Sequence, residues 1–250
     1  MKQVILLFGR TGLNFFVHFY RVCAYLGAAF GQLRYVHFYR RQIIEQMYRL
    51  GIGSIPLVIA LSLFTGLATA IQTAYQIASY IPKYIVGSIV FQSEMLELAP
   101  TLMALVLAGR VGAVIASEIG TMKVSEQIDA LESMGVDPIG YLVMPRLITG
   151  VTMFPIIIIF AVVVAVTGGF YVATTMMGVT AADFVRGMKE AFRFKDVWVG
   201  LIKATIYGGI ITLLGSYMGM ETEQGAKGVG IAATATVVSS SSFILIMDYV

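Results

Sequence analysis

The sequence predicts an all-α membrane protein with one N-terminal interfacial helix, five transmembrane helices and a short water-facing helix between the second and third spans. Two observations predict this class. Of the 250 residues, 58% are hydrophobic and only 12% are charged, whereas soluble domains carry about 25% charged residues. Polar stretches also divide the chain into five apolar segments of about 20 residues or more, the length that crosses a bilayer. We expect one domain over residues 1–250, with interfacial and cytoplasmic helices in 1–50 and a transmembrane bundle in 51–250.

The first fifty residues predict an interfacial helix on the cytoplasmic side. Residues 1–30 are apolar but carry one narrow polar stripe at helical spacing. The stripe consists of Arg10, Asn14, His18 and Arg21. A helix of this pattern usually lies in the membrane interface, and an ordinary membrane-facing helix end is the alternative. Over residues 1–50 there are seven Lys and Arg against one acid, a bias that places this end in the cytoplasm.

The first two spans, residues 52–78 and 84–117, each carry small residues four positions apart, a pattern that lets membrane helices approach closely. These ladders are Gly66, Ala70, Ala74 and Ala78 in the first span, and Ala108, Gly112, Ala116 and Gly120 from the second span into the helix that follows it. They predict close-packing faces, either between two copies of the chain or within one copy. The far end of the first span is made polar by Gln72, Thr73 and Gln76.

Several ionisable residues fall close to the predicted spans. Glu94 and Glu97 lie in the second span, where an acid is costly unless it is paired or hydrated. They either have a role or lie in the outer headgroup layer without one. Lys203 lies alone in the fourth span, and a lone lysine near a span end usually extends its ammonium to the interface. We therefore expect Glu97, Arg110 and Lys203 near span ends.

The remaining spans are residues 147–177, 197–220 and 231–250, which gives five crossings with the N-terminus inside and the C-terminus outside. This alternation places the polar segment 178–196 outside. Four bases against three acids in that segment make it the weakest point of the predicted topology. The much stronger bias of the N-terminal residues decides the orientation.

The stretch 108–146 mixes acids and bases with apolar residues more than any other part of the chain. Val124, Ile128 and Leu131 fall on one face of a helix, at i, i+4 and i+7. The charged residues that lie largely away from that face are Lys123, Glu126, Asp129 and Glu132. A glycine and a proline follow as a C-terminal stop. The pattern predicts an amphipathic helix of about three turns, whose apolar face packs either on the base of this protein or in a partner's cleft.

The chain shows no motif for catalysis or nucleotide binding. It lacks G-x-x-x-x-G-K-[ST], so it cannot hold a nucleotide phosphate by itself. It also lacks H-E-x-x-H and G-x-S-x-G, and one cysteine with two histidines argues against a metal site. The bases crowd the N-terminus and form no nucleic-acid patch. We expect a non-catalytic subunit without a cofactor. An ion-coupled secondary carrier and a structural membrane anchor are alternatives, although a carrier needs ionisable groups at mid-membrane.

The stretch 107–146 resembles the signature of the MlaE family, the permease subunits of ABC transporters that move phospholipids between bacterial membranes. The matching positions are Gly109, Arg110, Gly112, Glu118, Gly120, Thr121, Met122, Glu126, Gln127, Asp129, Ala130, Met134, Gly135, Asp137, Pro138, Pro145 and Arg146. Weaker similarity is found at Gln72, residues 97–100, Lys203 and residues 228–238.

Two departures from the family pattern bear on the lipid headgroup. Leu96 stands where many relatives carry an arginine, which leaves Glu97 without an adjacent basic partner. Ile231 and Ala235 stand where relatives often carry arginines. The resemblance therefore leaves the headgroup preference open.

The resemblance implies a homodimer in the bacterial inner membrane, with a cytoplasmic N-terminus. It also implies that the water-facing helix is a coupling helix that docks into a cytoplasmic ABC ATPase, which binds the ATP. The expected coupling residues are Glu118, Lys123, Val124, Glu126, Ile128, Asp129, Leu131 and Glu132. A phospholipid held between two protomers is expected to contact Gln72, Thr73, Gln76, Ile77, Glu97, Thr234 and Val238. Other expected partners are a lipid-binding MCE-domain protein and, often, a STAS-domain subunit on the ATPase.

Overall fold

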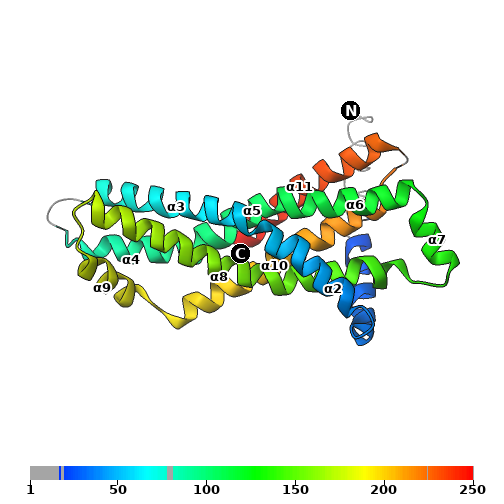
Figure 1. Ribbon diagram of the computed structural model, residues 1–250, viewed down its shortest axis with the longest axis horizontal. Helices are drawn as coiled ribbons and strands as arrows, with labels where there is room; N and C mark the ends of the chain where they lie inside the picture. The colour runs from blue at the N-terminus through cyan, green and yellow to red at the C-terminus, as the bar shows by residue number, and fades with distance from the viewer. Residues whose placement is uncertain (1–16, 18–19, 78–80, 224, 250) are drawn as a thin grey trace, which may run out of the picture.

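Five helical rods form a long bundle in the computed structural model, which describes residues 17, 20–77, 81–223 and 225–249 (Figure 1). The described residues contain no strand. The rods that are long and apolar enough to cross a membrane are Arg40–Gln76, Tyr84–Val124, Ile139–Thr175, Phe194–Met220 and Ala226–Tyr249. The predicted class, an all-α membrane protein with five spans, is confirmed.

The first rod begins earlier than the sequence predicted. It consists of α2 (Arg40–Gln46), a π-helical turn (Met47–Gly51), a 3₁₀ turn (Ile52–Ser54) and α3 (Ile55–Gln76). Pro56 lies in the first turn of α3, where its missing N–H has no helical acceptor in any case. Because Gly51 keeps a negative φ of −82° in the right-handed region, the helix continues through it. The helix therefore begins before residue 52, where the predicted span starts. Ala78 of the first ladder lies outside the described residues.

The second rod contains two π-helical stretches. It consists of α4 (Tyr84–Ser93), η4 (Glu94–Leu102), α5 (Met103–Leu107), η5 (Ala108–Gly112) and α6 (Ala113–Val124). Pro100 lies inside η4 and has no N–H to give to the carbonyl of Leu96, four residues before it. π-helical stretches within α-helices are frequent at functional sites, and η4 carries Glu94 and Glu97.

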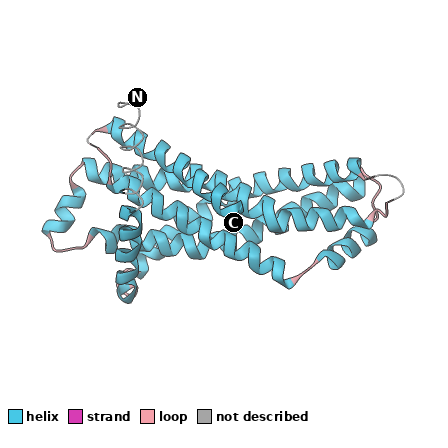
Figure 2. Ribbon diagram, turned by 180° about the vertical axis from the view of Figure 1, so that it is seen from behind, coloured by secondary structure: helices cyan, strands magenta, loops and turns pink. Residues whose placement is uncertain are grey.

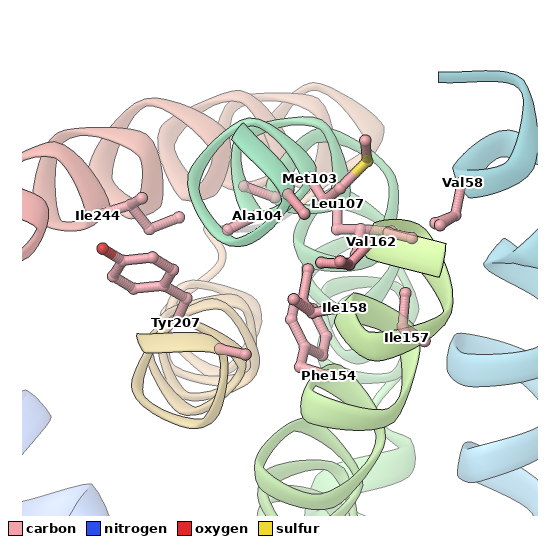
Figure 3. Packing of buried hydrophobic residues seen from close by; sticks show 14 of the residues in the cluster. Val58, Met103, Ala104, Leu107, Phe154, Ile157, Ile158, Val162, Tyr207 and Ile244 are labelled. Carbon is pink, nitrogen blue, oxygen red and sulfur yellow. The ribbon is translucent and has the colours of Figure 1, made fainter. Parts of the chain in front are cut away.

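The central helix of the bundle is α8 (Met144–Thr175), which follows a π-helical turn (Ile139–Val143). It packs along α3 on one side and along α10 (Phe194–Met220) on the other. Figure 3 shows Ile158 and Val162 of α8 beside Leu107 of α5, and all three side chains are buried. This apolar contact joins the second and third rods in the middle of the bundle.

The N-terminal helix runs across the bundle rather than along it (Figures 1 and 2). Residues 20–31 are helical, and a 3₁₀ turn follows at Gln32–Tyr35. Arg21 donates to Glu221 at 2.7 Å, and the side-chain amide of Gln32 donates to Asp137 at 2.7 Å. These bonds tie the helix to two loops of the bundle. A helix across the spans agrees with the predicted interfacial position. The other stripe residues lie outside the described residues, namely Arg10, Asn14 and His18.

The two short helices α7 (Gln127–Ser133) and α9 (Ala181–Ala191) lie at opposite ends of the bundle (Figures 1 and 2). α9 packs on α4, and the N-terminal helix lies toward the end that carries α7 (Figure 1). The last span, α11 (Ala226–Tyr249), starts at the α7 end and stops near the middle of the bundle. The polar segment 178–196 therefore lies at the end opposite α7, as the alternation of spans predicted.

Both small-residue ladders pack inside one chain. A Cβ added at Gly66 would lie 1.8 Å from the carbonyl oxygen of Ala165 on α8, so α3 and α8 touch backbone to backbone. A Cβ added at Gly112 would lie 3.1 Å from a methyl group of Thr236 on α11 and 3.3 Å from one of Ile211 on α10. The structure shows packing within one copy, and the ladders give no support to a dimer.

Replacing Gly66 by alanine is expected to lower the free energy of unfolding by about 3 kcal/mol or more, because α3 and α8 must separate to admit the methyl group. Thermal unfolding of the purified protein in detergent measures the loss. Gly209→Ala is the matched control, since a Cβ there meets only Val151 Cγ2, at an ordinary 3.6 Å. Equal melting temperatures of the two variants would contradict the backbone contact.

Candidate functional site

The helix is interrupted between the second rod and α7. α6 ends at Val124, and Glu126 has a positive φ of 59°, which residues other than glycine adopt rarely. The hydroxyl of Ser125 donates back to the carbonyl of Thr121 at 2.7 Å, a local bond that competes with the helical pattern. α7 therefore has only seven residues. The predicted single helix of about three turns is wrong, because Lys123 and Val124 belong to the end of α6.

α7 turns one face to the protein and the other to water. Ile128 is buried at 1% exposure, and Leu131 packs against the same core. The exposed acids are Glu126, Asp129 and Glu132. Asp129 pairs with Lys123 at 3.1 Å, so one acid already has a partner in its own chain. Of the two predicted alternatives for the apolar face, the structure shows packing on the protein's own base.

Glu118 joins three rods shortly before α7. Its Oε1 accepts a hydrogen bond from Arg49 of the first rod, and its Oε2 accepts one from Arg146 of the third rod at 3.1 Å. The Arg146 side chain is only 6% exposed and also donates to the carbonyl of Leu142 at 2.8 Å. We call Arg49, Glu118 and Arg146 the basal triad. Glu118, predicted among the coupling residues, is thus bonded inside the protein.

Lys203 of α10 holds a polar cluster inside the bundle. Its Nζ donates to Asp248 Oδ1 at 2.9 Å, to Glu97 Oε1 at 3.0 Å and to the carbonyl of Leu96 at 3.3 Å. That carbonyl is the one to which Pro100 can give no N–H. The Lys203 side chain is 18% exposed. The prediction that Lys203 extends alone to the interface is wrong, because two carboxylates meet its ammonium inside the protein.

Asp248 brings α11 into the same cluster. Besides Lys203, its Oδ1 accepts hydrogen bonds from Thr101 of η4 at 2.7 Å and from the hydroxyl of Tyr207 on α10 at 2.8 Å. Three segments thus meet at one carboxylate oxygen. Arg110 also lies within a rod, in η5, and donates to the carbonyl of Gly53. The prediction that Glu97, Arg110 and Lys203 lie near the ends of the membrane-crossing segments stays a prediction.

A polar groove of about 380 Å³ lies between α3 and η4. It is lined by Thr69, Gln72, Thr73, Gln76, Ser93, Glu97 and Leu98. Four of the predicted lipid-contact residues therefore line one groove. The other three lie elsewhere, since Ile77 lines a separate pocket, and Thr234 and Val238 are exposed on α11 in the other half of the bundle (Figure 1).

Glu94 lies fully buried beside this groove. Its Oε1 accepts a hydrogen bond from Thr69 Oγ1 at 3.4 Å, and Thr69 itself lines the groove. Among the residues that the structure describes, no partner is found for Glu94 Oε2. The buried carboxyl group of Glu94 therefore lies beside the groove without a cation next to it.

The sequence profile described as Permease MlaE matches residues 43–250. The chain is 31% identical over 252 residues to the intermembrane phospholipid transport system permease protein MlaE of Haemophilus influenzae, covering 100% of this chain and 93% of the relative. It is 38% identical over 211 residues to a probable ABC transporter permease protein of Rickettsia typhi, covering 84% and 82%. The chain belongs to the MlaE permease family.

The family extends to a plant relative. The chloroplastic protein TRIGALACTOSYLDIACYLGLYCEROL 1 of Arabidopsis thaliana is 32% identical over 210 residues, which cover 84% of this chain and 60% of the relative. The resemblance stated for residues 107–146 is therefore confirmed at the level of the family. This MlaE permease is an integral membrane protein of the ABC transporter permease type.

Two groups of interacting polar residues in this MlaE permease were not predicted from the sequence, namely the cluster around Lys203 and the basal triad. Asp248 left a signal, because it is an acid inside the last apolar span, and such residues usually have a partner. For the basal triad, the sequence contained no such signal. Its partners are 69 and 28 residues apart in the sequence, so only the packing of the rods brings them together.

Proposed function

We propose that the chain is the permease subunit of an ABC transporter that moves phospholipids between the inner and outer membranes of a bacterium, driven by a separate ATPase. The observation that carries this proposal is α7, whose apolar face is buried on the bundle while its acids face water at one end. A helix held in this way can transmit a movement of a bound partner to the rods. The Haemophilus relative is named as a phospholipid transport permease, which supports phospholipid as the cargo.

The proposal includes the partners that the family suggests. The permease acts as a homodimer in the inner membrane with a cytoplasmic N-terminus, beside an MCE-domain protein and, in some systems, a STAS-domain subunit. Seven bases against one acid in residues 1–50 support a cytoplasmic N-terminus. The N-terminal helix and α7 lie toward the same end (Figure 1), so α7 is expected on the cytoplasmic side, where an ATPase can reach it. ATP is bound by that ATPase, and the permease needs no cofactor.

We propose that the predicted coupling residues have different tasks. Ile128 and Leu131 hold α7 on the bundle, and Glu118 holds the rods together. Contact with the ATPase is proposed for the exposed acids of α7, above all Glu126 and Glu132. No ion pair of these two is found among the described residues, so their charges are available to basic groups of a partner.

Reversing the charge of these two acids, Glu126→Lys with Glu132→Lys, is expected to release the ATPase. Like charges across an interface cost several kcal/mol, so co-purification through a tag on the permease should fall at least tenfold. The permease itself should stay in the membrane at its normal level, because neither side chain packs in the bundle.

The matched control is Glu190→Lys, which makes the same change on α9 at the other end of the bundle. Co-purification should be unchanged there. If the α7 double variant also keeps its ATPase, the docking proposal fails.

Transport is tested with the permease and its co-purified ATPase in vesicles that contain fluorescent phospholipid. ATP is expected to increase phospholipid transfer to acceptor particles, and a non-hydrolysable analogue should not. A structural anchor would bind the same ATPase but show no ATP-dependent transfer. That result would contradict the proposed function while leaving the docking result intact.

A further inference from the structure

The groove beside α3 offers hydrogen-bond donors together with a carboxylate, and its lining holds no cation. The polar lining consists of the amides of Gln72 and Gln76, the hydroxyls of Thr69, Thr73 and Ser93, and the carboxylate of Glu97. Amide and hydroxyl groups can donate to a phosphate oxygen. Glu97 is the charged residue of the lining, and its side chain is 56% exposed. A polar ligand in this groove therefore meets a negative charge.

Lys203 cannot serve as a phosphate-binding cation for such a ligand. An ammonium has three N–H donors, and Lys203 directs them to Asp248, Glu97 and the carbonyl of Leu96. Lys203 occupies only Oε1 of Glu97. Among the described residues no hydrogen bond to Glu97 Oε2 is found, and that oxygen is left for a ligand.

The carboxyl groups around the groove outnumber the cations. In the described part of this cluster, Glu97 and Asp248 share the single ammonium of Lys203, and Glu94 has no cation beside it. Glu94 is fully buried, with one oxygen unpartnered. Electrostatic interactions are stronger and reach further in such a low-dielectric region than in water. A cation placed in the groove would therefore be attracted by the carboxylate of Glu97 directly and by the carboxyl group of Glu94 behind Thr69.

We propose that this groove selects phospholipids whose headgroup carries an ammonium, such as phosphatidylethanolamine and phosphatidylcholine, over anionic phosphatidylglycerol. The ammonium lies against Glu97 Oε2, and the phosphate accepts hydrogen bonds from the amides of Gln72 and Gln76. This inference rests on the proposed function, because it assigns the headgroup of the transported lipid. The groove lies on the half of α3 that is farther from α7 (Figure 1), so the headgroup is bound toward the α9 end.

Lipid retention measures this preference. The full-length permease is inserted into nanodiscs with equal amounts of phosphatidylethanolamine and phosphatidylglycerol of identical acyl chains. It is then purified out in mild detergent, and the retained lipid is extracted for mass spectrometry. We expect about fivefold enrichment of phosphatidylethanolamine, the size of one partly exposed ion pair. When phosphatidylcholine replaces phosphatidylethanolamine, it should also be enriched over phosphatidylglycerol. Its headgroup carries the same positive charge, although it has no N–H.

Two substitutions locate the selection in the groove. Glu97→Gln should abolish the enrichment or reverse it, because it removes the carboxylate and frees a donor of Lys203 for phosphate. Glu94→Gln, which keeps the shape of the side chain, should lower the enrichment about twofold or more. Total retained lipid should stay constant in both variants. Glu190→Gln on α9 is the control and should keep the wild-type ratio.

The outcomes separate this inference from the proposed function. Retained lipid in the same ratio as the nanodisc would overturn the headgroup assignment and leave the permease function standing. Enrichment that survives both groove substitutions, or that is lost with phosphatidylcholine, would also overturn it. Absence of any phospholipid above the detergent background would instead contradict the proposed function.

Discussion

Replacing Lys203 by methionine is expected to lower the free energy of unfolding by about 3 kcal/mol, because it leaves partly buried carboxylates without their cation. Asp248 is 20% exposed in its side chain and would keep only its hydrogen bonds from Thr101 and Tyr207. That carboxylate links α10, α11 and η4 by hydrogen bonds. The measurement is the melting temperature of the purified protein in detergent, followed by tryptophan fluorescence or by size-exclusion chromatography after heating.

A second substitution tests whether the loss comes from the unpaired charge. Lys203→Met with Asp248→Asn removes the cation and one carboxylate together, and it should recover part of the stability lost in the single variant. Lys189→Met on α9 removes an exposed cation and should change little. If the single variant melts like wild type, or if the double variant is no more stable than the single one, the cluster does not stabilise the fold in this way.

The sequence was sufficient to predict the spans, because apolar length is a local property. The boundaries were harder. The first rod runs back to Arg40 through a glycine and a following proline, both of which normally indicate an end. The proline falls in the first turn of α3, where helices accept it, and the glycine keeps a negative φ. Local residue types cannot show which of these conformations the surrounding rods impose.

The polar cluster around Lys203 shows why residue-by-residue reasoning fell short in the interior. Taken alone, a lysine in a span is expected to reach the interface. Its two carboxylate partners lie 106 and 45 residues away in the sequence, so only the packing of α10 against α11 and η4 brings them together. The polar side of the groove on α3 was easier to predict, because Gln72, Thr73 and Gln76 follow one another along the polar end of a single helix.

The interruption of the helix before α7 also could not be predicted from the periodicity of the apolar residues. The spacing of Val124, Ile128 and Leu131 suits one continuous helix, and the pattern extends across the break without a sign of it. The break depends on Glu126, whose φ of 59° is unusual for a residue with a side chain. Had a glycine stood there, the sequence would have suggested two helices.

Replacing Glu118 by alanine is expected to lower the free energy of unfolding by about 3–5 kcal/mol, because it leaves the guanidinium of Arg146 buried without a carboxylate. The Arg146 side chain is 6% exposed, so water cannot replace Glu118 well. The same change should also weaken transport. The basal triad links the first three rods shortly before α7, and without it a push on α7 has a weaker connection to the rods. Melting temperature measures the first effect, and phospholipid moved per ATP hydrolysed measures the second.

An apolar version of the triad separates stability from coupling. Replacing buried ion pairs by hydrophobic residues is often neutral for stability, so Glu118→Met with Arg146→Met should melt close to wild type. We still expect ATP hydrolysis, but with less phospholipid transferred. Contacts between flexible methionine side chains allow the rods to shift relative to one another, whereas ion pairs hold them in one geometry. Arg186→Met with Glu190→Gln removes an exposed ion pair on α9, at the other end of the bundle, as the control. If the methionine pair transfers phospholipid as efficiently as wild type, the triad is a packing device and the push reaches the rods through Ile128 and Leu131 alone.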